Sequence, residues 1–210
     1  MALLRQTAIR ARAQKRAKSE GVSVDEALRS ASQRRNSRYD IFLSQTIHDA
    51  EIVLGVYDYL TSKGFVVFCD WIDEPNADRN EVTPANAPFI RETMEKCDTL
   101  LFLDTESADQ SLWMCWELGW FDGGCGPVGI LPVLKDDQRY YRGREFLGLY
   151  PYFEEDSHGE LKVVRPVVTS PEGMMIFEAP NSRKFETWRE SSQDYMRPSV
   201  PSLTHLTYSL

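Results

Sequence analysis

The sequence predicts an α/β fold, in which a central parallel β-sheet is flanked by helices and preceded by a helical arm. The first observation is that short apolar segments alternate with segments whose apolar residues recur at helical spacing. The second is that FVVFCD (65–70) is apolar on both faces, as a buried parallel strand is. The third is size: 210 residues, 42% of them hydrophobic, provide a core for one domain without disulfide staples.

Residues 1–38 are predicted to form a basic helical extension. A first helix is expected over residues 2–18, and Gly21 separates it from a second one. Ser23 and Glu26 have the spacing of a capping box, which places the start of the second helix at Ser23. Because the extension contains few apolar residues, it is not expected to bury much surface by itself.

Residues 39–167 are predicted to form the main domain. Strands are expected at YDIFLS (39–44), FVVFCD (65–70), TLLFLD (99–104), VGILPVL (128–134) and LKVVRPV (161–167). Helices are expected at about 48–62, from Asn86 and Pro88 onwards, and at SLWMCWELGWF (111–121), where GGCG (123–126) ends the helix. A long polar loop is expected at 71–86 and a charged loop at 136–146. Such alternation is typical of a parallel sheet wrapped by helices.

Residues 168–210 are predicted to be a C-terminal extension. An edge strand is expected at GMMIFE (173–178) and a last helix at FETWRESSQDYM (185–196). A tail rich in Pro, Ser and Thr follows them.

Charge is divided unevenly along the chain. Residues 1–38 carry ten basic and three acidic residues, a net charge of +7, whereas the remaining 172 residues carry −15. The acidic part is a poor candidate for binding nucleic acid, because phosphate contacts need a basic face. The basic extension could contact nucleic acid, a membrane surface, or the acidic body of its own or a neighbouring copy, or it could stay solvated.

The cysteine pattern and the lack of a long apolar run indicate a cytoplasmic protein. The four cysteines show no CxxC spacing, so neither a disulfide framework nor a zinc site is expected, and free thiols are typical of a reducing compartment. No segment has the roughly 18 consecutive apolar residues of a membrane span. The Arg-rich, acid-free first 18 residues leave an organelle transit peptide as an alternative.

Polar residues end the predicted strands, namely Ser44, Asp70 and Asp104. In an open parallel sheet, ligands bind beyond the carboxyl ends of the strands, so a site is expected there. No GxGxxG motif follows the first strand and no GxxxxGK[ST] motif occurs, which disfavours a Rossmann dinucleotide site and an NTPase phosphate loop. With only three scattered histidines, no metal site is expected.

The segment 111–121 carries the most unusual pattern. Trp113, Glu117 and Trp120 lie at i, i+4 and i+7, which places a carboxylate on the same helix face as two indole rings. The ring faces offer walls for a planar ligand. The same spacing is also met by tryptophans that pack in a core beside a surface glutamate.

The ordered segments YDIFLS, GFVVFCD, DTLLFLDTES and SLWMCWEL resemble the TIR (Toll/interleukin-1 receptor) domain family over about residues 38–135. This resemblance implies a flavodoxin-like TIR fold. Trp113 and Glu117 match the W-x-x-x-E pattern of the family's enzymatic branch. The match implies that Glu117 is the catalytic carboxylate and that Trp113 shapes its pocket.

The resemblance also implies substrate-binding residues. Ser44 and Gln45 would lie near the ribose and phosphates of the substrate, although Gln45 stands where tyrosine is common in the family. Asp70 would lie at the pocket rim, where the so-called BB loop begins. Trp71 follows Asp70 directly, and from its aromatic ring alone it is inferred to be a stacking candidate for nicotinamide or adenine.

The chain resembles the bacterial NAD+-consuming branch in particular, including the TIR proteins of Thoeris-type antiphage defence. This implies an NAD+ glycohydrolase or cyclase that releases nicotinamide and makes an ADP-ribose-derived signalling nucleotide, with NAD+ as substrate and no other cofactor. It also implies self-association through TIR surfaces and the BB loop, and a separate effector protein that responds to the nucleotide. The alternatives are a non-catalytic TIR adaptor and an enzyme resembling nucleoside 2-deoxyribosyltransferases, which share the sheet topology and a glutamate.

Overall fold

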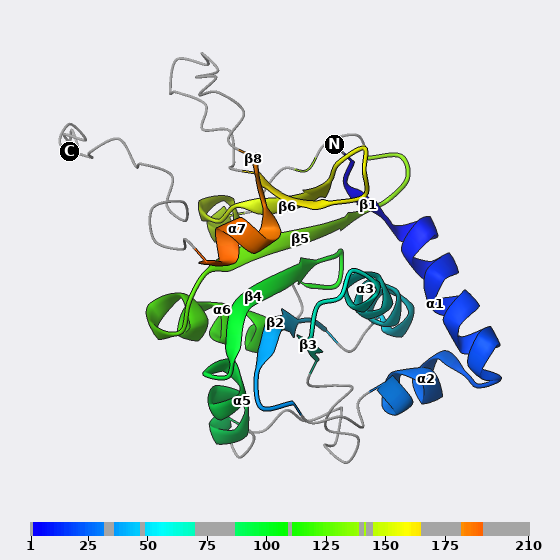
Figure 1. Ribbon diagram of the computed structural model, residues 1–210, viewed down its shortest axis with the longest axis horizontal. Helices are drawn as coiled ribbons and strands as arrows, with labels where there is room; N and C mark the ends of the chain where they lie inside the picture. The colour runs from blue at the N-terminus through cyan, green and yellow to red at the C-terminus, as the bar shows by residue number, and fades with distance from the viewer. Residues whose placement is uncertain are drawn as a thin grey trace, which may run out of the picture.

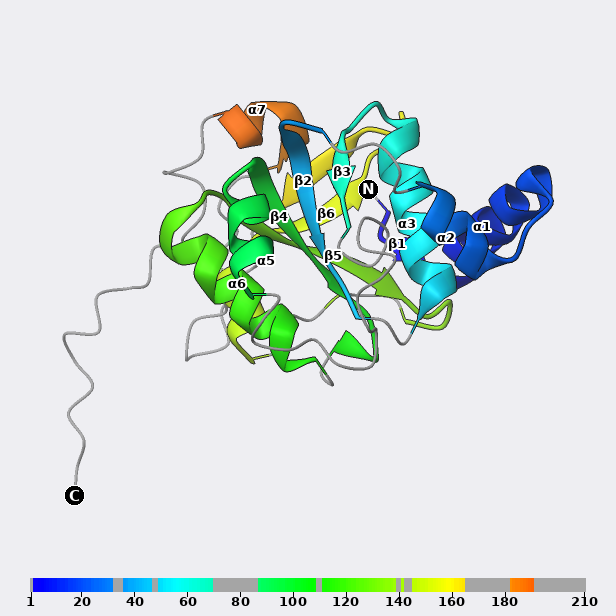
Figure 2. The ribbon, with the colours of Figure 1, turned by 90° about the horizontal axis from the view of Figure 1, so that it is seen from below.

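The computed structural model describes residues 2–31, 36–46, 49–69, 87–108, 111–138, 141, 145–164 and 182–190. Within these residues the chain forms one sheet with helices on both of its faces (Figure 1 and Figure 2). The strands are β1 (Leu4–Arg5), β2 (Tyr39–Ser44), β3 (Val67–Phe68), β4 (Cys97–Asp104), β5 (Val128–Leu134), β6 (Tyr152–Glu155), β7 (Leu161–Val164) and β8 (Ser182–Lys184). The helices are α1 (Gln6–Glu20), α2 (Val24–Ala31), α3 (Ala50–Ser62), α5 (Ala87–Met94), α6 (Leu112–Gly124), the 3-10 helix η3 (Glu145–Leu149) and α7 (Phe185–Glu190).

The sheet has the order β3-β2-β4-β5-β6-β7-β8, and β1 pairs with β5. The strands from β3 to β6 are parallel to one another, which confirms the predicted α/β fold with a central parallel sheet. Of the predicted strand 161–167, residues 165–167 lie outside the described residues, and residues 161–164 form β7, which is antiparallel to β6. The reason is a tight hairpin, in which Gly159 adopts a left-handed φ of 79°. The preceding strand β6 was not predicted.

Two hydrophobic clusters lie on opposite faces of the sheet. Along β4, Leu101 and Leu103 belong to one cluster, whereas Leu100 and Phe102 belong to the other. Because successive side chains of a strand point to opposite faces, both faces of β4 are buried. The first face is covered by α3, with α1 and α2 outside it, and by α7; the second is covered by α5 and α6 (Figure 2).

Most predicted helix boundaries lie within a few residues of the observed ones. The capping box is confirmed, because Glu26 N donates to Ser23 Oγ at 3.2 Å and Ser23 N donates to Glu26 Oε2 at 2.9 Å. Helix α6 continues through two residues of the GGCG segment, ends at Gly124 and has Cys125 as its C-cap. The predicted edge strand 173–178 lies outside the described residues, as do residues 191–196 of the predicted last helix.

The N-terminal segment does not stay solvated but packs against the rest of the domain. Ile9 and Ala13 of α1 are buried against α3, and a Cβ atom at Gly55 of α3 would lie 2.2 Å from the carbonyl oxygen of Ile9. Small residues therefore bring the two helix backbones into contact, and this burial needs no large apolar side chains. Figure 1 shows α1 lying along the outer side of α3.

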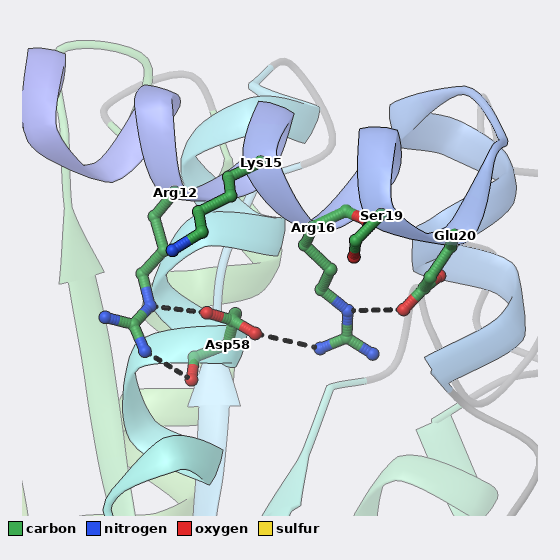
Figure 3. A pocket seen from close by; sticks show the side chains of 6 residues that line it. All are labelled: Arg12, Lys15, Arg16, Ser19, Glu20 and Asp58. Carbon is green, nitrogen blue, oxygen red and sulfur yellow. Dashed lines mark hydrogen bonds and ion pairs between the residues drawn. The ribbon is translucent and has the colours of Figure 1, made fainter.

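Ion pairs join the basic helix α1 to the acidic helix α3. Arg10 contacts Asp49 at 2.7 Å and Glu51 at 2.8 Å. Arg12 and Arg16 both reach Asp58, as Figure 3 shows. Of the contacts considered for the basic extension, the one observed is with the acidic body of its own chain.

Candidate active site

Buried polar residues gather at the carboxyl ends of two adjacent parallel strands. Ser44, Gln45 and Thr46 end β2 or follow it directly, and all three are buried. Asp104 ends β4 and is followed by Thr105, and these two are buried as well. The two strands are paired, with Ser44 opposite Phe102, so these groups lie at one edge of the sheet. This is the edge at which the strand-end rule predicts a ligand site.

A buried carboxylate from α6 reaches the same edge. The Ser44 Oγ atom donates a hydrogen bond of 2.6 Å to Oε2 of Glu117, across 73 positions of the chain. This length is typical of a hydroxyl that donates to a carboxylate. The exposed fractions of Ser44 and Glu117 are 1% and 4%. The serine therefore fixes the orientation of a carboxylate that is largely withdrawn from solvent.

The sequence of α6 explains why Glu117 is directed inward. The helix begins at an N-cap, Ser111, whose side chain accepts a hydrogen bond from Met114 N at 3.4 Å. Met114, Leu118 and Phe121 form its buried stripe. At 3.6 residues per turn, Glu117 lies at the edge of this stripe, on the side of the tryptophans. A carboxylate at that edge is buried with the stripe and reaches the end of β2.

The tryptophans of α6 form a ladder whose arrangement differs from the predicted one. The rings of Trp113 and Trp116 meet edge to face at 5.1 Å, and those of Trp116 and Trp120 stack at 6.3 Å. The Arg91 guanidinium of α5 lies 4.3 Å from the centre of the Trp120 ring. Trp120 was expected beside the carboxylate, but it is 37% exposed and packs on the ladder and on Arg91, whereas Glu117 turns towards β2. Trp113 is half-buried against the cluster beneath α6.

The structure thus brings together three of the six site residues inferred from the sequence. Ser44 and Glu117 are in contact, and Gln45 follows Ser44 directly. The predicted role of Trp113, shaping the pocket of Glu117, stays a prediction. Asp70 and Trp71 lie outside the described residues.

Thr46 and Thr105 are also buried at the strand ends, although neither was among the six named site residues. Both lie in the segments after the predicted strands 39–44 and 99–104, where the strand-end rule places a ligand site. Within the described ranges, no group of three or more His, Cys, Asp and Glu residues is placed to hold a metal ion. No helix in that part of the chain is both long and apolar enough to cross a membrane.

The comparisons with known proteins point to one kind of relative. The chain is 48% identical over 121 residues to a protein of Bacillus cereus (strain MSX-D12) named "Probable 3' cyclic ADP-D-ribose synthase ThsB'". The aligned region covers 56% of this chain and 62% of the relative, so the chain spans about three fifths of that protein's length. This similarity confirms the predicted resemblance to bacterial TIR proteins of the Thoeris type.

The search of solved structures gives a more distant likeness. The crystal structure of the TIR domain of the Toll-related receptor TRR-2 from Hydra magnipapillata shares 20% identity, with a TM-score of 0.37. The match covers 52% of this chain and 78% of that one, and at this score it carries no weight for function. No family model matches the chain.

Proposed function

We propose that this protein cleaves the bond between nicotinamide and ribose in NAD+, and that it makes an ADP-ribose-derived signalling nucleotide in antiphage defence. The observation that carries the proposal is the buried Glu117 carboxylate, held by Ser44 at the carboxyl edge of the sheet. The relative named as a cyclic ADP-ribose synthase supports both the substrate and the product class.

The chemistry follows from the charge that develops during cleavage. When nicotinamide departs with the bonding electron pair, the ribose acquires oxocarbenium character, and the cationic pyridinium becomes neutral nicotinamide. A carboxylate beside the ribose stabilises this positive charge and accepts hydrogen bonds from the ribose hydroxyls. Glu117 is assigned this catalytic role. NAD+ is the substrate, and no further cofactor is assigned.

Ser44 is assigned the task of orienting the carboxylate. Its hydroxyl donates a hydrogen bond to Oε2 of Glu117, which leaves the carboxylate little freedom to rotate when the substrate binds. Gln45, Asp70, Trp71 and Trp113 are proposed to bind the rest of the NAD+ molecule.

The nucleophile that captures the ribose decides the product. Water gives ADP-ribose, whereas a nucleophilic atom of the same NAD+ molecule closes a ring and gives a cyclic isomer; in both cases one proton is released to the solvent. We assign ring closure as the main outcome, because the relative is named as a cyclic ADP-ribose synthase. Mass spectrometry cannot by itself separate cyclic isomers, so products are resolved by chromatography first.

The test compares Glu117→Gln with wild type in the release of nicotinamide from NAD+. Removing a group that stabilises transition-state charge is expected to lower kcat by about 10²- to 10³-fold. Glu92→Gln is the matched control, because Glu92 is an exposed acid on α5 that pairs with Lys96. Equal release by Glu117→Gln and wild type would remove Glu117 as the catalyst. No release by any of the three proteins would favour the non-catalytic adaptor, and transfer of deoxyribose between bases would favour the transferase.

Assembly and signalling belong to the same proposal. Copies of the chain are proposed to associate through their TIR surfaces and the loop 71–86, and the nucleotide is proposed to act on a separate effector protein. Specific activity is then expected to fall on dilution. Activity per molecule that stays constant on dilution to the monomer would contradict the assembly.

A further inference from the structure

The N-terminal segment contacts two loops at the edge of the sheet where Glu117 lies. We call β1 and α1 together, residues 4–20, the N-terminal clasp. The clasp begins beside the end of β5, where Leu4 pairs with Val133 and Arg5 pairs with Leu134, in parallel. It then runs as α1 along α3, the helix that follows β2 and Ser44.

The first contact holds the connection after β5. The Arg5 guanidinium donates to the carbonyl oxygen of Lys135 at 3.1 Å and to that of Gln138. The Thr7 hydroxyl donates to the carboxylate of Asp136 in the same connection. Arg5 and Thr7 lie at the junction of β1 and α1, so this end of the clasp is hydrogen-bonded to both the backbone and a side chain of the connection after β5.

The connection after β5 is joined in turn to the one after β4. The Lys135 ammonium contacts the Glu106 carboxylate at 2.5 Å. Glu106 lies two residues beyond Asp104, the buried acid that ends β4. The first contact therefore extends to a second loop at the candidate site.

The second contact of the clasp holds the start of α3. The Arg10 guanidinium bridges Asp49 and Glu51, at 2.7 Å and 2.8 Å. Asp49 is also the N-cap of α3, because its carboxylate accepts a hydrogen bond from Ile52 N at 3.4 Å. The pKa of Glu51 lies below its usual value because of hydrogen bonds from Gln14 and then from Arg10, both on the clasp.

The start of α3 lies close along the chain to the serine that orients Glu117. Asp49 follows Ser44 by five residues, and Gln45 and Thr46 between them are buried. Because this connection is short, the position of the first turn of α3 limits where Ser44 can lie. The clasp itself is held by Ile9 and Ala13, which are buried against α3.

We infer that Arg10 is a positioning residue for catalysis, which fixes the start of α3 and thereby the contact between Ser44 and Glu117. This inference rests on the proposed function. Arg10 does not itself act on the substrate. Its two ion pairs hold Asp49 and Glu51 in place and neutralise two acids beside the connection that follows Ser44.

The test compares Arg10→Ala with Arg12→Ala. Arg12 lies on the same helix and also pairs with an acid of α3, but its partner Asp58 is in the second half of α3. Arg10→Ala is expected to lower kcat for nicotinamide release by about 10- to 100-fold, because small displacements of catalytic groups have effects of this size. Arg12→Ala is expected to keep kcat within about twofold of wild type, since its ion pair lies away from the start of α3.

Two further measurements separate positioning from loss of folding. Arg10→Lys is expected to recover part of the lost kcat, because an ammonium group can keep one of the two ion pairs. Hydrogen–deuterium exchange, measured without NAD+, is expected to increase at residues 49–54 in Arg10→Ala and not in Arg12→Ala. Thermal unfolding of each variant shows that activity is measured on folded protein.

The outcomes are distinguishable from failure of the proposed function. If wild type does not cleave NAD+, the proposed function fails and the catalytic role of Arg10 falls with it. If wild type cleaves NAD+ and Arg10→Ala keeps its kcat, the inference is overturned while the proposed function stands. Equal losses of kcat in Arg10→Ala and Arg12→Ala overturn it too, because they indicate a general effect of weakening the α1–α3 contact.

Discussion

Replacing Gly55 by alanine is expected to destabilise the protein by forcing α1 away from α3. The added Cβ atom would lie 2.2 Å from the carbonyl oxygen of Ile9, where contacts under 3.0 Å are essentially never found, and 2.7 Å from Ile9 Cγ2. The neighbour is backbone, so the helices must separate by about 0.8 Å, the difference between 2.2 and 3.0 Å. Overpacking of this kind costs about 1–3 kcal/mol.

The intrinsic preference for alanine in a helix opposes this cost. Alanine is more favourable than glycine in a helix by about 0.5–1 kcal/mol, so at the middle of both ranges the free energy of unfolding falls by about 1.25 kcal/mol. For a domain of this size, the loss corresponds to a fall in Tm of about 2.5–5 °C.

The assay is equilibrium unfolding in urea, with Gly119→Ala as the control. Gly119 lies in α6, and a Cβ atom there has nothing within 4 Å, so this variant is expected to gain about 0.5–1 kcal/mol. The two variants are therefore expected to shift the unfolding midpoint in opposite directions. A Gly55→Ala protein as stable as wild type, or stabilised like Gly119→Ala, would refute the close approach of α1 and α3.

Two other predictions concern the site and the response to acid. Ser44→Ala removes the hydrogen-bond donor to the Glu117 carboxylate. It is expected to lower kcat for nicotinamide release by about 10- to 100-fold, which is the effect of losing a hydrogen bond to a charged group. An unchanged kcat would contradict the orienting role of Ser44. The pKa of Asp156 is lowered to about 2, most strongly by the hydrogen bond from Glu160 N and further by the Lys162 ammonium. A carboxyl whose pKa is depressed in the folded protein stabilises the fold when the pH is above the ordinary carboxyl pKa, and this stability is lost as the pH falls. Asp156→Asn is therefore expected to lose less stability than wild type between about pH 4 and 2, as measured by urea midpoints. Equal losses would contradict this.

The central strands could be predicted from sequence because their burial leaves a direct trace. Strands β2 and β5 were predicted with the bounds observed, 39–44 and 128–134, since short segments that are mostly apolar mark strands buried on both faces. Strand β1 has only two residues and β6 has four, so neither shows a period that could be recognised. What makes them strands is the partner they meet in the folded chain.

The packing of the N-terminal helix was missed for a different reason. Its buried side chains are Ile9, Ala13 and Ala17, a stripe that is narrow and mostly of small residues. Such a stripe is hard to recognise in a sequence that is otherwise polar, because its small side chains bury little apolar area. The complementary feature is Gly55, which lies on another helix and is not adjacent in sequence.

For the site, the sequence could indicate which face of the helix carries Glu117 but not what that face meets. Helical spacing relates Glu117 to Trp113 and Trp120, yet it says nothing about which neighbour lies opposite. The partner, Ser44, belongs to a strand 73 positions away and was inferred as a separate binding residue. Their contact, and the exposure of Trp120, follow from how α6 docks on the sheet.

The placement of β1 constrains the order in which the chain can fold. Leu4 pairs with Val133, and Ala2 forms a bridge with Glu155, so these residues are synthesised long before their partners. The same side of β5 takes β6 at Ile130 and β1 at Val133, which leaves a short opening that the N-terminal residues fill. Pairing of β1 with β5 is thus a late contact between residues far apart in sequence. Contacts of this kind slow folding, and β1 stays unpaired during synthesis until β5 has been made.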